Sequence, residues 1–220
     1  MGIKVGILGL AGSGKDTFAT MLQKHLPDFA IDRYAAPLKA LTAEVYNCTL
    51  EELEDRAFKE KPKQVSRDVM IESVFYCLTN VLNFTEEELD KASELFFEHF
   101  GSAKALSPRE FQQVFGTDVV RAVKPNAWVQ HLQGKGDNLI VPDVRFDNEL
   151  CDYNILITGR IGINKPKPTH SSELYAWRLE HDWSLELPPE NFDVVENVFI
   201  EGLEPLRVKA LEQALIIQKL

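Results

Sequence analysis

A glycine-rich stretch near the start of the chain has the residue types and spacing of a phosphate-binding loop. In GLAGSGKDT, Gly9, Gly14 and Lys15 fit the pattern G-x-x-x-x-G-K-[ST], and Asp16 stands where a hydroxyl is expected. Glycines let successive backbone N–H groups point inward at phosphate oxygens, and the lysine adds a mobile positive charge. The stretch therefore predicts a polyphosphate site. The alternative is a glycine-rich turn that binds nothing.

Asp16 is the departure from this pattern, and its carboxylate would repel a triphosphate unless a cation or a proton lies between them. It could hold Mg²⁺ directly or through water, with Thr17 taking part of the hydroxyl's role. It could instead orient or deprotonate an acceptor oxygen near the γ-phosphate. A third reading gives Asp16 only a structural role, in which it stabilises the N-terminus of the next helix through the helix dipole.

The stretch LIVPDVRFDNE has a second set of groups suited to phosphate chemistry. Asp143 follows an apolar strand, as in a Walker-B element, where the carboxylate faces Mg²⁺. Arg145 comes next at the carboxyl end of that strand and could form two hydrogen bonds to a phosphate. Glu149 lies four residues beyond and could hold the guanidinium. The alternative is a surface Arg–Glu pair worth under about 1 kcal/mol.

Two further segments place cations where an anionic ligand could use them. In FGTDVVRAVKPNAWV, Arg121 and Lys124 lie on one side of a predicted helix, and Trp128 either stacks on a nucleobase or packs in the core. The composition of residues 160–172, RIGINKPKPTHSS, predicts a mobile basic loop. Its cations could neutralise charge on a transferred phosphoryl group, or the loop could simply be solvated. The cationic side chains of this loop are Arg160, Lys165, Lys167 and His170.

Apolar runs predict the strands that must position these residues. The predicted strands are residues 3–8, 29–35, 138–143, 154–159 and 193–200. After the glycine loop, Phe18, Met21, Leu22 and Leu26 predict a helix that ends at Pro27. A C-terminal helix is predicted with three leucines on one face, namely Leu206, Leu211 and Leu215.

The long segment 37–135 between the second and third strands is predicted to be helical. Three capping boxes mark helix starts within it, and they are Thr49 with Glu52, Thr85 with Glu88, and Ser107 with Glu110. The layout is a parallel α/β core with one large helical insertion and one small basic lid. Small-molecule kinases need such parts, because an acceptor must be held and water excluded.

Composition limits the classes of ligand and compartment. The 220 residues have a formal net charge of -10, which argues against sequence-independent binding of DNA or RNA. Three cysteines, Cys48, Cys77 and Cys151, have no metal-like spacing and indicate reduced thiols in the cytoplasm. No apolar run reaches membrane-spanning length, so a soluble protein is expected.

Together these stretches resemble the deoxynucleoside monophosphate kinases of tailed bacteriophages. The likeness is carried by GSGKDT, AAPLK, FGTDVVR with Trp128, VPDVRFDNE, and HSSE at 170–173, and it runs over nearly the whole chain. It implies an α/β P-loop NTPase fold, with a parallel sheet flanked by helices. The parts implied are a single kinase domain over 1–220, with its core at 1–36 and 136–220, a helical acceptor-binding insertion at 37–135, and a lid at about 160–175.

The same resemblance implies an activity and a set of site residues. The enzyme would transfer the γ-phosphate of ATP, with Mg²⁺, to a deoxynucleoside monophosphate for dNTP supply. The implied catalytic residues are Lys15, Asp16, Arg145 and Glu149. The implied ATP-binding residues are Gly12, Ser13, Gly14, Lys15, Asp16, Thr17, Arg160 and Asn197. The implied acceptor-binding residues are Lys39, Arg121, Lys124, Trp128, Asp143 and Arg145, and the implied Mg²⁺ ligands, direct or through water, are Asp16, Thr17 and Asp143.

The partners expected are ATP and a deoxynucleoside monophosphate, with no nucleic-acid polymer and no membrane, and the sequence allows a homodimer. Two rival functions stay open. One is a kinase for another phosphorylated acceptor, such as phosphomevalonate or dephospho-coenzyme A. The other is a nucleotide-dependent switch or assembly ATPase, which would call for a D-x-x-G switch and a base-reading N-K-x-D. The chain has neither at the expected places, since Lys167 ends the NKPK stretch.

Overall fold

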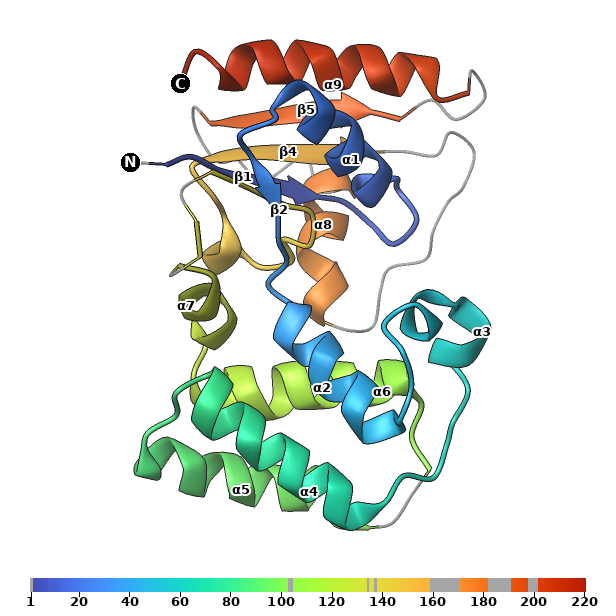
Figure 1. The fold of residues 1–220 in the computed structure, drawn as a ribbon, viewed down its shortest axis with the longest axis vertical. Helices are drawn as coiled ribbons and strands as arrows, with labels where there is room; N and C mark the ends of the chain where they lie inside the picture. The colour runs from blue at the N-terminus through green and yellow to red at the C-terminus, as the bar shows by residue number, and fades with distance from the viewer. Residues whose placement is uncertain are drawn as a thin grey trace. The chain divides into compact units, whose positions relative to one another are not determined.

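Figure 1 shows the fold in a computed structural model, which describes residues 2–102, 105–133, 135–136, 138–158, 171–181, 191–197 and 202–220. The chain divides into two compact units. The first, called the sheet unit here, comprises Met1–Tyr34 and Lys135–Leu220, and the second, the helical unit, comprises Ala35–Gly134. In the described part of the chain, no helix is both long and apolar enough to cross a membrane.

The sheet unit is an α/β structure built on five parallel strands in the order β2-β3-β1-β4-β5. The strands are β1 (Lys4–Leu8), β2 (Ala30–Ile31), β3 (Leu139–Val141), β4 (Tyr153–Thr158) and β5 (Phe192–Glu196). The helices α1 (Lys15–His25), α8 (Ser171–His181) and α9 (Glu204–Ile217) flank the sheet, and the short η4 (Asp147–Glu149) follows β3 (Figure 1). This architecture is compatible with the predicted fold class.

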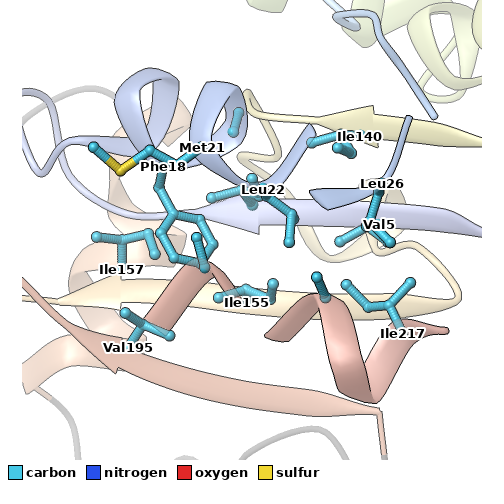
Figure 2. Close-up of a cluster of buried hydrophobic side chains, with 14 of the residues drawn as sticks. Val5, Phe18, Met21, Leu22, Leu26, Ile140, Ile155, Ile157, Val195 and Ile217 are labelled. Carbon is cyan, nitrogen blue, oxygen red and sulfur yellow. The ribbon is translucent and has the colours of Figure 1, made fainter. Parts of the chain in front are cut away.

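The hydrophobic core of the sheet unit explains why the strands are continuous apolar runs. Val5 and Ile7 of β1 are fully buried, and in register Val5 lies between Ile140 of β3 and Tyr153 of β4. Figure 2 shows Phe18 and other α1 side chains meeting those of the strands and of α9 in one cluster. Central strands of a parallel sheet are covered on both faces, so they need apolar residues throughout.

Two predicted elements of the sheet unit differ from the structure. The second strand spans Ala30–Ile31 instead of 29–35, because the Asp32 carboxylate accepts the Arg33 N–H at 2.7 Å as the chain turns out of the sheet. On α9, Leu206 is buried but Leu211 and Leu215 are exposed. Leu211 lies five residues beyond Leu206, about 140° around a helix with 3.6 residues per turn. The residues that share the buried face with Leu206 are Ala210, Gln213, Ala214 and Ile217.

The predicted mobile loop, residues 160–172, and the predicted lid at about 160–175 both reach into a helix. Residues 171 onward form α8, so the loop prediction is wrong for its last two residues. Arg160, Lys165, Lys167 and His170 lie outside the described residues, so their predicted roles stay predictions.

The helical unit contains short helices with well-formed starts. Its elements are α2 (Ala36–Tyr46), η1 (Glu52–Glu54), α3 (Arg56–Lys59), α4 (Arg67–Tyr76), η2 (Cys77–Val81), α5 (Glu86–Phe100), α6 (Pro108–Gln113), η3 (Val114–Arg121) and α7 (Ala127–Gln133). The reciprocal bonds of all three predicted capping boxes are confirmed. Those of Thr85 and Ser107 cap α5 and α6, and those of Thr49 lie in the turn that leads into η1, whose N-cap is Glu51. The predicted insertion covers nearly the same residues as this unit, and its acceptor-binding role stays a prediction.

Aromatic side chains form much of the core of the helical unit. Phe96 and Phe100 of α5 stack with ring centroids 5.1 Å apart, and Phe111 and Phe115 stack at 5.7 Å. Phe100 joins the two pairs, with its ring 5.5 Å from that of Phe111. Large buried rings supply much apolar area per residue, which suits a unit built from short helices.

Candidate functional site

The candidate site lies at the carboxyl edge of the sheet, where the loops after four strands carry polar residues. The glycine loop Gly9–Gly14 follows β1, Arg33 follows β2, Asp143 and Arg145 follow β3, and Asn197 follows β5. The chain goes from β1 to β2 and β3 on one side of β1, and then crosses to β4 and β5 on the other side of β1. In open parallel sheets, ligands bind outside the carboxyl ends of the strands at such a switch point.

The glycines of the loop adopt conformations that other residues rarely reach. The φ angles of Gly9, Gly12 and Gly14 are 145°, 75° and 96°. A Cβ on Gly9 would also lie 2.5 Å from the Ile157 carbonyl oxygen and 2.6 Å from Ser13 Oγ, so no side chain fits there. Gly14 is the N-cap of α1 and supplies no capping side chain, which leaves the positive end of the helix facing the loop.

Lys15 folds back over the loop that precedes it. Its Nζ donates to the carbonyl oxygens of Gly9 at 2.7 Å and Leu10 at 2.9 Å. A pocket with about 340 Å³ of empty space, open solvent at its mouth included, has both Lys15 and Arg145 in its wall. The other lining residues are Gly9, Leu10, Ala11, Val144 and Ala176. Two predicted site cations therefore line one hollow, where a single anionic ligand could contact both.

Asp16 forms an ion pair that sequence reasoning missed. Its Oδ1 lies 2.8 Å from Arg33 Nη2, and its side chain is 72% exposed. The guanidinium offsets the negative charge that makes Asp16 the departure from the G-x-x-x-x-G-K-[ST] pattern. A partial sequence signal was present, because Arg33 lies near the carboxyl end of the second predicted strand, FAIDRYA, and the carboxyl ends of parallel strands share one edge. Thr17 lies next to Asp16 and is also exposed.

Glu149 holds the backbone that carries Arg145. The carboxylate is 2% exposed, and its Oε2 accepts the N–H of Arg145 at 2.6 Å and of Phe146 at 3.1 Å. The sequence predicts that Glu149 holds the Arg145 guanidinium, and the structure shows Glu149 bonded to the Arg145 backbone N–H. The Arg145 side chain is exposed at the pocket wall. Glu149 therefore acts by positioning the segment after β3.

Tyr34 links the ends of β2 and β3 and was not predicted. Its backbone N–H donates to Asp143 Oδ1 at 3.0 Å, and its hydroxyl donates to the Glu149 carbonyl oxygen at 3.1 Å. Burial raises the pKa of the Tyr34 hydroxyl well above its ordinary value, with Cys151, Glu149 and Asp143 adding to the shift. The hydroxyl therefore stays protonated and remains a hydrogen-bond donor.

Asn197, predicted to bind ATP near the adenine, is 2% exposed at the end of β5. Its Nδ2 donates to the Ser13 carbonyl oxygen at 2.8 Å. Ser13 is itself buried, and its Oγ has no hydrogen-bond partner among the described residues. The structure thus brings Asn197 to the glycine loop through a backbone atom of that loop.

The other predicted acceptor residues belong to the helical unit, and each has contacts inside it. Lys39 pairs with Glu54 at 2.5 Å, and Arg121 Nη1 donates to the Pro125 carbonyl oxygen at 3.2 Å. Lys124 donates to the Asn83 carbonyl oxygen at 3.1 Å. No contact among these three cations is described, so an acceptor pocket built from them stays a prediction.

Trp128 is packed in the core of the helical unit. The side chain is 3% exposed, and its indole N–H donates to the Gly116 carbonyl oxygen at 3.2 Å. Of the two alternatives that the sequence left open, this placement favours core packing over stacking on a base. A buried indole with a satisfied N–H is typical of a structural tryptophan.

The donor groups at the carboxyl edge of the sheet fit a magnesium nucleotide in which phosphate and water supply most of the ligands. Among the described residues, no group of three or more His, Cys, Asp and Glu side chains could hold a metal ion. Asp16 in the first turn of α1 and Asp143 after β3 offer hard carboxylate oxygens, and Thr17 of α1 offers a hydroxyl. Mg²⁺ commonly binds through one or two carboxylates plus substrate phosphates and retained waters.

No protein-family model and no curated protein sequence matches this chain. The sheet unit combines a glycine loop with positive φ angles, a helix N-terminus and two cations lining one pocket. This arrangement can bind a polyanion without a basic surface, which agrees with a chain whose net charge is -10.

Proposed function

We propose that this protein is a phosphotransferase that moves the γ-phosphoryl group of ATP, with Mg²⁺, to the phosphate of a deoxynucleoside monophosphate. One observation carries the proposal: the first part of the glycine loop (Gly9, Leu10 and Ala11) lines the same pocket as Lys15 and Arg145, at the carboxyl edge of a parallel sheet. A loop of backbone donors with a lysine is suited to the β- and γ-phosphates, and a separate arginine is suited to a second phosphate. Within the proposal the fold is of the P-loop kinase type.

The chain's own residues would contribute positioning and charge. The loop amides and Lys15 would bind the ATP phosphates, and Arg145, fixed through its backbone by Glu149, would bring the acceptor phosphate into line. Bound Mg²⁺ would neutralise charge on the β- and γ-phosphate oxygens. Asp16 would contact either that ion or the acceptor oxygen, with Arg33 balancing its charge.

The choice of a nucleotide acceptor rests on the resemblance to the phage kinases, above all on VPDVRFDNE. The pocket itself would suit any small phosphorylated acceptor. The experiment must therefore vary the acceptor.

The test is release of ADP from ATP by the purified protein with millimolar Mg²⁺ and a panel of acceptors. The panel contains deoxynucleoside and ribonucleoside monophosphates, phosphomevalonate and dephospho-coenzyme A. We expect ADP release that depends on a deoxynucleoside monophosphate. ADP release that depends on only one of the other phosphates would identify that compound's class as the acceptor in place of deoxynucleoside monophosphates. ADP release without any acceptor would favour the switch or assembly ATPase.

Variants identify the site in the same assay. Lys15→Ala and Arg145→Ala should each remove most acceptor-dependent ADP release while the protein stays folded. The matched controls are Lys24→Ala, at an exposed lysine in the last turn of α1, and Arg207→Ala, at an exposed arginine on α9. Both controls should behave as wild type. Wild-type activity in Arg145→Ala would remove that residue from the site.

A further inference from the structure

The loop contact of Asn197 joins two segments 184 residues apart in sequence. The Asn197 backbone N–H donates to the Thr158 carbonyl oxygen at 3.1 Å, which extends the pairing of β5 with β4 by one residue. From that fixed backbone, the side chain reaches the glycine loop and donates to the Ser13 carbonyl oxygen at 2.8 Å. Donor and acceptor residues are both buried, so water does not compete for this bond.

The geometry of the peptide bond gives this contact a consequence for the loop. A peptide unit is planar and trans, so the carbonyl of one residue and the N–H of the next point in opposite directions. A bond that holds the Ser13 carbonyl toward Asn197 therefore holds the Gly14 N–H pointing away from Asn197. Gly14 has φ of 96°, and glycine populates several other backbone conformations about as readily. A contact from outside the loop can therefore select this one.

Ser13 has few other restraints that could set this direction. Its own N–H donates to the Leu10 carbonyl oxygen at 3.0 Å, but its Oγ has no hydrogen-bond partner among the described residues. The Ser13–Gly14 peptide plane is thus oriented from outside the loop by Asn197.

We propose that Asn197 is a positioning residue for the glycine loop, which acts through the Ser13 carbonyl to aim the Gly14 N–H at a bound phosphate. This role replaces the predicted contact with adenine, and its effect on phosphate binding rests on the proposed function. Loss of the donor would leave a buried carbonyl unsatisfied and allow the peptide plane to turn. The loop would then bind a polyphosphate more weakly even where the fold is intact.

Asn154 on β4 offers a matched control for this role. It is 5% exposed, and its side chain also bonds a backbone, with Oδ1 accepting the Cys151 N–H at 2.9 Å and Nδ2 donating to the Cys151 carbonyl oxygen at 2.8 Å. These bonds shape a turn on the segment before β4. Substitutions at Asn154 should therefore lower stability as much as those at Asn197 but leave the loop unchanged.

The first measurement uses the free protein and needs no nucleotide. In Asn197→Ala we expect hydrogen exchange at the Ser13 and Phe18 amides, which donate to Leu10 and Gly14 carbonyl oxygens, to be faster by at least about tenfold. Asn154→Ala should leave exchange at these two amides unchanged. Asn197→Leu has nearly the same size and no donor in any protonation state, so it serves as the second variant if the alanine protein does not fold.

The second measurement is ATP affinity by calorimetry with millimolar Mg²⁺. Asn197→Ala should weaken ATP binding by at least about tenfold, whereas Asn154→Ala should bind as wild type does. Unchanged exchange in Asn197→Ala, or an equal loss of affinity in both alanine variants, would overturn the positioning role. Faster exchange in a protein whose wild type binds no ATP would support the positioning of the loop and reject the proposed function.

Discussion

Asp16 and Arg33 form an ion pair at the carboxyl edge of the sheet, with 2.8 Å between Oδ1 and Nη2. Asp16 lies in the first turn of α1, directly after Lys15, and Arg33 lies after β2. A carboxylate at this position would repel ATP, and the arginine offsets that repulsion. Under the proposed function, the pair explains how the glycine loop can tolerate an acidic residue beside its lysine.

Removal of Arg33 should weaken ATP binding through Asp16. In Arg33→Gln the Asp16 charge is uncompensated, and we expect ATP to bind about fivefold more weakly. This factor corresponds to an interaction of ~1 kcal/mol between exposed charges. The double variant that also carries Asp16→Asn should bind ATP as tightly as wild type. Calorimetry on wild type, the two single variants and the double variant gives the coupling energy between Asp16 and Arg33. Arg207→Gln, which breaks the exposed pair with Glu204, is the control and should not change affinity. Equal affinities in Arg33→Gln and wild type would show that the pair does not shield the nucleotide.

Asp16→Asn alone separates binding from turnover. The fold should be retained, because the carboxylate is exposed and its pair with Arg33 contributes at most about 1 kcal/mol to the free energy of unfolding. Turnover in the ADP-release assay should fall far more than ATP affinity, since an amide neither binds Mg²⁺ as well nor accepts a proton. A catalytic role is refuted if Asp16→Asn turns over at the wild-type rate.

Glu149 should matter for stability as well as for activity. Glu149→Ala leaves the Arg145 and Phe146 N–H groups without their buried acceptor, which should cost about 1–3 kcal/mol of unfolding free energy. Urea denaturation measures this loss. Glu98→Ala, at an exposed glutamate of α5, is the control and should stay within about 0.5 kcal/mol of wild type. A Glu149→Ala protein as stable as wild type would mean that the acceptor is replaceable by water.

The features that sequence predicted best are local ones. The apolar runs around Val5, Ile140 and Ile155 indicate buried parallel strands because each run carries its own pattern. The capping box of Thr85 and Glu88 was predictable because both partners lie within one turn. Local signals therefore predicted the strands and the helix starts, and placed the glycine loop after a strand.

The features that sequence did not predict depend on tertiary contacts. The pair of Asp16 with Arg33 and the contact of Asn197 with Ser13 join segments that meet only because the strands share one edge. The buried face of α9 was missed because packing against neighbouring elements, and not the spacing of the leucines, decides which side of the helix is covered.

Buried Cys77 predicts a loss of stability at alkaline pH. Burial raises the pKa of its thiol to about 12, and the Glu44 carboxylate adds to the shift, whereas an unfolded thiol has a pKa of about 8.5. The folded pKa is higher than the unfolded one, so the Cys77 thiol favours the folded state while it is protonated. This contribution to the free energy of unfolding is fully present below about pH 8.5 and is lost as pH rises toward 12. From pH 9 to 10.5 the thiol should remove about 2 kcal/mol of unfolding free energy.

The matched variants for this prediction are Cys77→Ala and Cys48→Ala. Urea unfolding at each pH should show a shallower alkaline decline for Cys77→Ala than for wild type, whereas Cys48→Ala should keep most of the decline because Cys48 is only half-buried. Parallel pH profiles for Cys77→Ala and wild type would contradict the buried-thiol explanation.

Binding of a polyphosphate by the glycine loop and Lys15 can be measured by calorimetric titration of the protein with ATP at millimolar Mg²⁺. We expect wild type to give a saturable one-site heat, and Lys15→Ala to bind at least about tenfold more weakly, since a charge-assisted contact to phosphate is lost. A wild-type protein that gives no binding heat, and no protection of the loop amides by ATP, would contradict the account. So would a Lys15→Ala protein with wild-type affinity.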